Sequence, residues 1–112
     1  MDAAFARLVA VAASTGLPGI ETAMSYGTPS LKVAGKFLAR IKDADTLVIR
    51  CDLAEKAFLM ESAPDIFYET DHYTGHPAVL VRLSAADDAA IAGRIESAWR
   101  MQAPRRVQGK RK

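Results

Sequence analysis

The chain has 112 residues, of which half are hydrophobic and a quarter are charged, the balance of an ordinary globular protein. It is long enough for one domain and too short for two. Its apolar stretches fall far short of the ~20 residues that cross a bilayer. No basic leader precedes an apolar run, and a single cysteine, Cys51, excludes an internal disulfide. We therefore expect a cytoplasmic protein with no membrane partner.

The positive charges are unevenly distributed along the chain. The net charge is +2, but five of the fifteen Lys and Arg residues lie in the last eight positions. Residues 1–104 therefore carry ten basic against thirteen acidic side chains, so the overall charge gives no argument for nucleic acid. We expect one domain over residues 1–104, followed by a basic, disordered tail over residues 105–112.

The first half of the chain predicts one helix and three strands. Residues 2–14 carry apolar side chains at helical spacing, namely Phe5, Leu8, Val9 and Ala12. Gly16 and Pro18 end this helix. Strands are predicted over residues 20–26, 31–33 and 36–41. The last two flank Ala34-Gly35, a tight turn in which glycine takes positive φ.

The second half predicts a further strand over residues 46–51 and a short helix over 53–62, with Asp52 as its N-cap. Two strands follow, over 66–70 and 79–83. The last helix begins near Ser84 or Asp87 and ends near Gln102, and its apolar stripe is Ile91, Ile95, Ala98 and Trp99. Strands joined by short loops are antiparallel. The sequence therefore predicts an α+β fold, an antiparallel sheet with the N- and C-terminal helices packed on one face.

Successive side chains of a strand point to opposite faces of the sheet. In three of the predicted strands this divides the residues into a core set, which faces the helices, and an outward set, which faces away from them. The core set is Phe37, Ala39, Ile41, Leu47, Ile49, Cys51, Val79, Val81 and Leu83. The outward set is Lys36, Leu38, Arg40, Val48, Arg50, Leu80 and Arg82. An uncovered face that mixes basic and apolar residues suits a partner bearing phosphate. The alternative is a solvated face whose arginines pair with Asp52 and Glu69.

No residue cluster predicts an active site. The chain lacks the nucleophile elbow and the glycine-rich phosphate loops. His72 and His76, with Asp71, have a spacing that holds a metal on a helix, but Gly75 and Pro77 disfavour a helix there. Cys51 is interpreted as a buried structural thiol. We expect no catalytic residue, no metal and no cofactor.

Several segments resemble the MmcQ/YjbR family in the right order. The first is Ser25-Tyr26-Gly27-Thr28-Pro29-Ser30-Leu31-Lys32-Val33-Ala34-Gly35-Lys36-Phe37-Leu38-Ala39-Arg40. Residues 47–52, 67–77 and 79–83 are similar to the same family, as are Ala98-Trp99-Arg100 and Pro104-Arg105-Arg106. The resemblance spans residues 5–106, nearly the whole predicted domain.

This resemblance implies a CyaY-like fold and a DNA-binding role attached to a double-wing arrangement of β-hairpins. Iron-binding proteins of that fold use an acidic ridge, which is reduced here to Asp2 and Glu21, so we expect no iron site. The resemblance, the outward set and the basic tail together give the candidate DNA-binding residues. These are Lys32, Lys36, Arg40, Arg50, Arg82, Arg105 and Arg106. The alternative is a non-catalytic module that binds a protein or a small ligand on the mixed face, edged by Tyr26, Tyr73 and His72.

Overall fold

The computed structural model describes residues 2–109. The first helix is α1 (Ala3–Ser14), and four strands follow: β1 (Ile20–Ser25), β2 (Thr28–Val33), β3 (Lys36–Asp43) and β4 (Thr46–Arg50). The remaining elements are α2 (Leu53–Ser62), β5 (Phe67–Tyr68), the 3-10 turn η1 (Asp71–Tyr73), β6 (Ala78–Arg82), α3 (Asp88–Gln102) and α4 (Arg105–Gln108).

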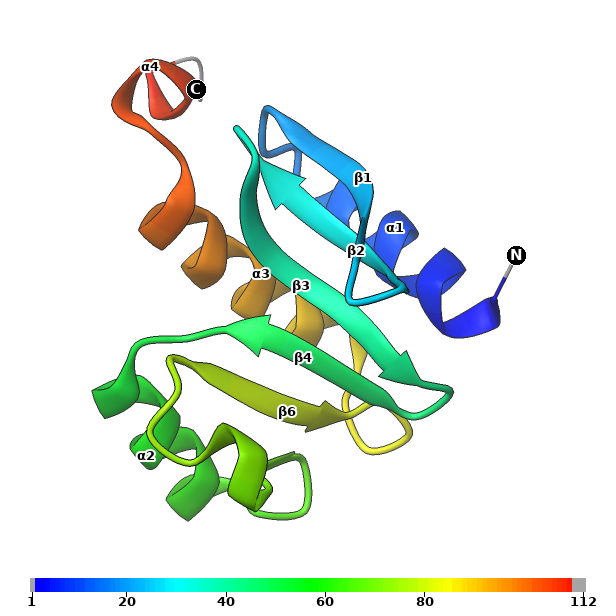
Figure 1. Ribbon diagram of the computed structural model, residues 1–112, viewed down its shortest axis with the longest axis vertical. Coiled ribbons are helices and arrows are strands. Elements are labelled where there is room, and N and C mark those ends of the chain that lie inside the picture. Colours follow the sequence, from blue (N-terminus) through cyan, green and yellow to red (C-terminus); the bar gives the residue numbers. More distant parts are fainter. Residues whose placement is uncertain (1, 110–112) are drawn as a thin grey trace.

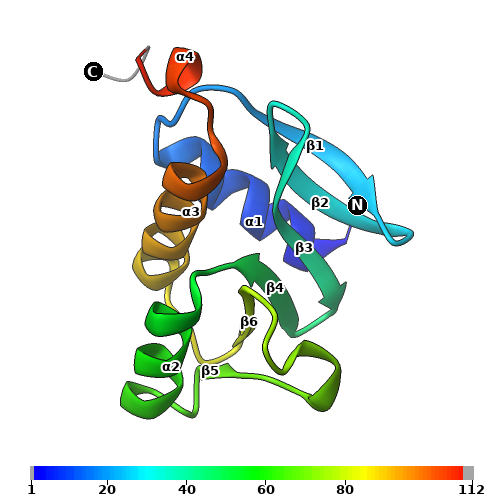
Figure 2. The same ribbon diagram turned by 60° about the vertical axis from the view of Figure 1, so that its left-hand side comes forward.

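All the strands join one antiparallel sheet in the order β1-β2-β3-β4-β6-β5. The helices α1, α2 and α3 lie on one side of this sheet (Figures 1 and 2). The predicted α+β class, with the terminal helices on one face, is therefore confirmed. Asp52 is confirmed as the N-cap of α2, since its carboxylate accepts from the backbone N–H groups of Ala54 and Glu55 at 2.9 and 3.0 Å.

Two tight turns set the register of the first three strands. Tyr26-Gly27 joins β1 to β2 with φ values of 53° and 75°, and Ala34-Gly35 joins β2 to β3 with φ values of 51° and 78°. Consecutive residues with positive φ form the turn whose twist matches that of antiparallel strands. The predicted Ala34-Gly35 turn is confirmed, although a β-carbon disfavours this conformation at Tyr26 and Ala34.

A β-bulge in β3 changes which residues face the helices. Two consecutive residues of β2 lie opposite Phe37 and Ala39, so Leu38 is an extra residue in β3. Leu38 and Ala39 are both fully buried on the helix side, whereas Phe37 packs on the opposite face. The prediction that Phe37 faces the core and Leu38 faces outward is therefore wrong, because an extra residue reverses the two-residue alternation beyond it.

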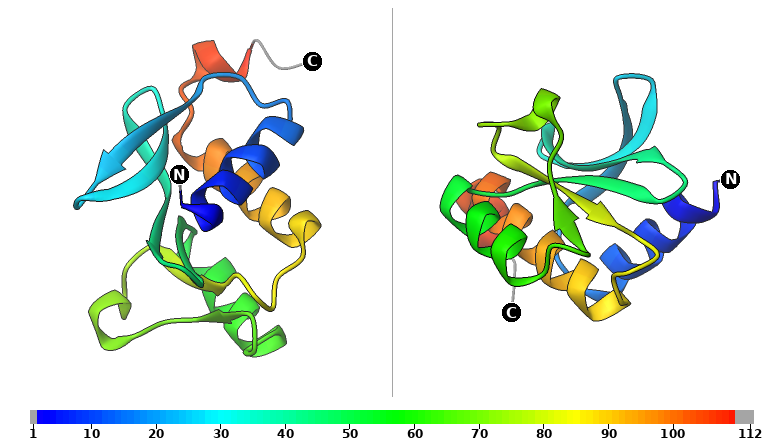
Figure 3. Two further views of the ribbon diagram at one scale, coloured as in Figure 1. Left: turned by 90° about the vertical axis from the view of Figure 1, so that its right-hand side faces the viewer. Right: turned by 90° about the horizontal axis from the view of Figure 1, so that it is seen from below.

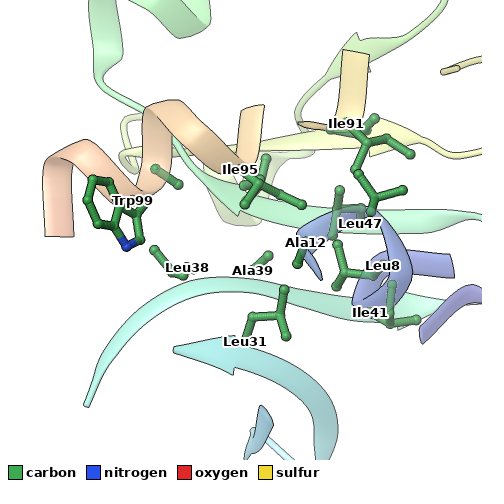
Figure 4. Packing of buried hydrophobic residues seen from close by; sticks show 14 of the residues in the cluster. Leu8, Ala12, Leu31, Leu38, Ala39, Ile41, Leu47, Ile91, Ile95 and Trp99 are labelled. Atoms are coloured by element: carbon green, nitrogen blue, oxygen red, sulfur yellow. The ribbon is translucent and has the colours of Figure 1, made fainter. Parts of the chain in front are cut away.

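The main core lies between the sheet and the helices α1 and α3 (Figure 4). The predicted helical stripes supply much of it, through Leu8, Ala12, Ile91, Ile95, Ala98 and Trp99. The indole Nε1 of Trp99 donates to the carbonyl of Pro18 at 2.9 Å, so the ring is buried with its donor satisfied. Nowhere between residues 2 and 109 is there a helix with the length and apolar character to span a membrane.

The expectation of disorder over residues 105–112 is wrong for residues 105–108, which form α4. Val107 packs against the core cluster beside Gly19, where a β-carbon would lie 3.1 Å from its Cγ1. The Gln108 side chain donates to the carbonyl of Ala103 at 2.8 Å. The side chain of Val107 therefore holds α4 against the core, although the basic composition of this segment predicts disorder. Positions 110–112 of the predicted tail lie outside the described residues.

We predict that Ala34→Asn stabilises the fold by about 1 kcal/mol, because asparagine tolerates the left-handed conformation that alanine disfavours. Chemical denaturation measures the free energy of unfolding. Ala44→Asn is the matched control, since Ala44 is also an exposed turn residue but has no positive φ. Equal effects at the two positions would show that backbone strain at Ala34 contributes nothing.

Candidate functional site

The face of the sheet away from the helices carries an open hollow of about 970 Å³. Its main lining residues are Tyr26, Lys32, Phe37, Arg40, Arg50 and Tyr73. We call it the arginine hollow. Its floor comes from β3 and β4, and its walls come from the β1–β2 hairpin and the segment around η1. Both walls project from the sheet on the side opposite the helices (Figures 2 and 3).

Arg40 connects the two walls. Its Nη2 donates to the hydroxyl of Tyr73 in η1, and its Nη1 donates to the hydroxyl of Thr28 in β2 at 3.4 Å. Its guanidinium carbon also lies 5.5 Å from the ring centroid of Tyr26 at the tip of the β1–β2 hairpin. The guanidinium is therefore held in one orientation beside the hollow by neutral partners.

Arg50 lies on the same floor but has fewer partners. Its guanidinium carbon is 6.0 Å from the ring centroid of Phe37. Its Nε is buried and has no hydrogen-bond partner among the described residues. A buried donor without an acceptor costs about 1–3 kcal/mol, so the position of the Arg50 side chain beneath the hollow reduces the stability of the fold.

The nearby carboxylates are occupied elsewhere. Glu69 Oε1 lies 2.6 Å from the Nζ of Lys56, and the Asp52 side chain caps α2. Over the described residues, no carboxylate forms an ion pair with Lys32, Arg40 or Arg50. The alternative prediction, arginines neutralised by Asp52 and Glu69, is therefore wrong. Within residues 2–109, the three cations of the hollow therefore have no ion-pair partner.

The other predicted basic residues lie outside the hollow. Lys36 is opposite Val33, a core residue, so the bulge places it on the helix side of the sheet. Arg82 is on the predicted face, but it lies over the ring of Tyr68 at 4.5 Å and donates to the carbonyl of Asp65. Arg105 and Arg106 are exposed on α4. The structure brings together only Lys32, Arg40 and Arg50.

The two histidines belong to the wall around η1. Their rings are nearly parallel, with centroids 6.0 Å apart, and both border the hollow. Tyr73, buried between the wall and the floor, makes edge contacts with both rings. Throughout residues 2–109, no group of three His, Cys, Asp or Glu side chains is arranged to hold a metal.

Lys56 is the residue of this region that sequence reasoning missed. It is 2% exposed, and its Nζ donates to the carbonyls of Tyr73 and His76 at 2.7 and 3.0 Å while contacting Glu69. One ammonium thereby fixes the η1 wall to α2. No sequence signal indicates it, because lysine is almost always exposed and its partners include backbone carbonyls.

We predict that Lys56→Met destabilises the protein by about 3 kcal/mol, because it removes the cation of a largely buried ion pair and leaves two carbonyls without their donor. Urea unfolding measures the loss. Lys42→Met is the control, since Lys42 is exposed. A loss no larger than that of the control would show that the Lys56 contacts add nothing to stability.

Cys51 is confirmed as a buried thiol, with no exposed surface. Burial, and to a lesser extent the charge of Glu55, raises the pKa of Cys51 from 9.0 to about 11. The folded chain therefore holds the thiol proton more tightly than the unfolded chain. This contribution to stability is complete below pH 9 and is lost as the pH rises from 9 towards 11.

We therefore predict that Cys51 does not react with a disulfide reagent in the folded protein near neutral pH, because its thiolate is scarce and shielded. Absorbance of the released thiol measures the reaction. Denaturant should expose one reactive thiol per chain. Rapid labelling without denaturant would contradict the burial of this side chain.

Comparisons with known proteins add a family to this description. The YjbR family model matches residues 15–101. The uncharacterised proteins Rv2570 of Mycobacterium tuberculosis and Mb2600 of Mycobacterium bovis are each 38% identical to this chain over 56 residues, 50% of the chain and 43% of each relative. The match thus spans less than half of those relatives. No solved structure matches, so the CyaY-like description stays a prediction. Because the family model covers most of the chain and every strand, the chain belongs to the YjbR family.

Proposed function

We propose that this chain binds DNA, with backbone phosphates held in the arginine hollow. The observation that carries the proposal is the cluster of Lys32, Arg40 and Arg50 around the hollow, since none of the three forms an ion pair with a carboxylate of the described residues. A phosphate oxygen is the acceptor that such cations favour, because hydrogen bonds between ionised partners are stronger than those between neutral ones.

Lys32 and Arg40 support the same assignment. Both line the hollow with Arg50, and the local carboxylates are occupied by Lys56 and by the N-terminus of α2. Contacts to phosphates orient a protein on nucleic acid without reading its sequence. The proposed role is therefore binding with little sequence preference and with a steep salt dependence.

The size of the hollow favours a second candidate, a small anionic ligand. A volume of about 970 Å³ lies within the range of roughly 300–1,000 Å³ that is typical of small-molecule sites. Such a ligand would use the same cations. It differs from the DNA proposal in needing no contact outside the hollow.

We predict that Arg50→Gln weakens binding of a labelled DNA oligonucleotide about tenfold and reduces the slope of log affinity against log salt by about one, because one phosphate contact is lost. Fluorescence anisotropy at low and physiological salt measures both quantities. Lys36→Gln, which removes a charge on the other side of the sheet, should leave affinity nearly unchanged.

The double variant Arg105→Gln/Arg106→Gln tests the contribution of α4 while retaining the packing of Val107. We expect a modest loss of DNA affinity that disappears at physiological salt, since exposed charges outside the hollow act at long range.

Absence of binding to single-stranded and duplex DNA at low salt would refute the proposed function. Equal losses for Arg50→Gln and Lys36→Gln would refute the site.

A further inference from the structure

The tip of the β1–β2 hairpin carries an unexpected residue. Tyr26 has a φ of 53° and is 92% exposed. The turn that it forms with Gly27 favours asparagine or glycine at this position, because a β-carbon is strained there. The ring therefore gains little from burial while its backbone is strained. Strain that the fold does not require is a reason to look for a function.

The ring of Tyr26 lies beside one of the cations of the hollow. It borders the hollow, and the guanidinium carbon of Arg40 is 5.5 Å from its centroid. Met24, also on this hairpin, is 62% exposed and borders the same hollow. The wall therefore presents an aromatic face and a flexible apolar side chain next to a site for an anion.

The floor repeats this pairing of cation and ring. Arg50 lies over Phe37 at 6.0 Å, and the parallel rings of His72 and His76 border the opposite wall. Cations interleaved with aromatic faces match a ligand that has both an anionic group and a planar group. A nucleotide is such a ligand, and its base stacks on an aromatic side chain only when it is not already stacked within a duplex.

We propose that the arginine hollow binds an unpaired nucleotide, with the phosphate at Arg40 and Arg50 and the base stacked on Tyr26. This inference rests on the proposed function and narrows it from DNA in general to the unpaired nucleotide. A nucleotide within a single strand and a free mononucleotide share this chemistry, and the hollow is large enough for either.

The test compares a labelled single-stranded oligonucleotide with its duplex by fluorescence anisotropy, using the wild-type chain, Tyr26→Leu and Tyr26→Phe. We expect the wild type to bind the single strand about tenfold more tightly than the duplex, the scale of one base stacked on one ring. Tyr26→Leu should lose this preference, and Tyr26→Phe should keep it.

Displacement of the oligonucleotide by unlabelled nucleoside monophosphate would identify the free nucleotide as a ligand. Binding of the strand without such displacement would place the nucleotide within a strand.

A third variant separates binding from folding. Tyr26→Asn should raise the midpoint of thermal unfolding, because asparagine suits the turn, while it weakens binding of the single strand as much as Tyr26→Leu does. Equal affinity for single strand and duplex, or unchanged affinity in Tyr26→Leu, would overturn the inference and leave the proposed function standing. Failure of the single strand, the duplex and the mononucleotide to bind would overturn both.

Discussion

The extra residue in β3 is the constraint on which the rest of the structure depends. Leu38 and Ala39 are neighbours in sequence, and both are fully buried against the helices. A regular strand cannot place two consecutive side chains on one face, so β3 contains a bulge. The bulge puts Phe37 and Arg40 on the same open face, three positions apart, and sends Lys36 to the other side. The floor of the arginine hollow is a consequence of burying one additional leucine.

Much of the fold is predictable because its signals are local. Helical spacing predicts α1 and α3, the Asp52 side chain marks the start of α2, and Gly35 marks a hairpin turn. Alternation is reliable in β4 and β6, which are regular, and it correctly separates Arg50 from Ile49. These features need only neighbouring residues, so composition and spacing are sufficient to find them.

The site is less predictable because it depends on contacts between distant segments. A bulge cannot be detected in the sequence when its residues are apolar, as Leu38 and Ala39 are. Alternation therefore places residues 39–41 correctly and residues 36–38 on the wrong faces. The role of Lys56 depends on carbonyls seventeen and twenty residues away. Val107 is a single apolar residue in a basic segment, and its close packing beside Gly19 depends on the absence of a β-carbon there.

Arg40 and Arg50 differ in the hydrogen bonds that each side chain would have to give up in order to bind an anion in the proposed site. In this structure, the Nη2 of Arg40 already donates a hydrogen bond to the hydroxyl of Tyr73. An incoming oxygen must displace that phenol or share the guanidinium with it, so Arg40 contributes only the difference between two acceptors. The Arg50 guanidinium has a contact with the ring of Phe37, and its Nε has no acceptor among the described residues. In the proposed complex, Arg40 therefore keeps the two walls in place, while the Nε of Arg50 has no acceptor within residues 2–109 to give up.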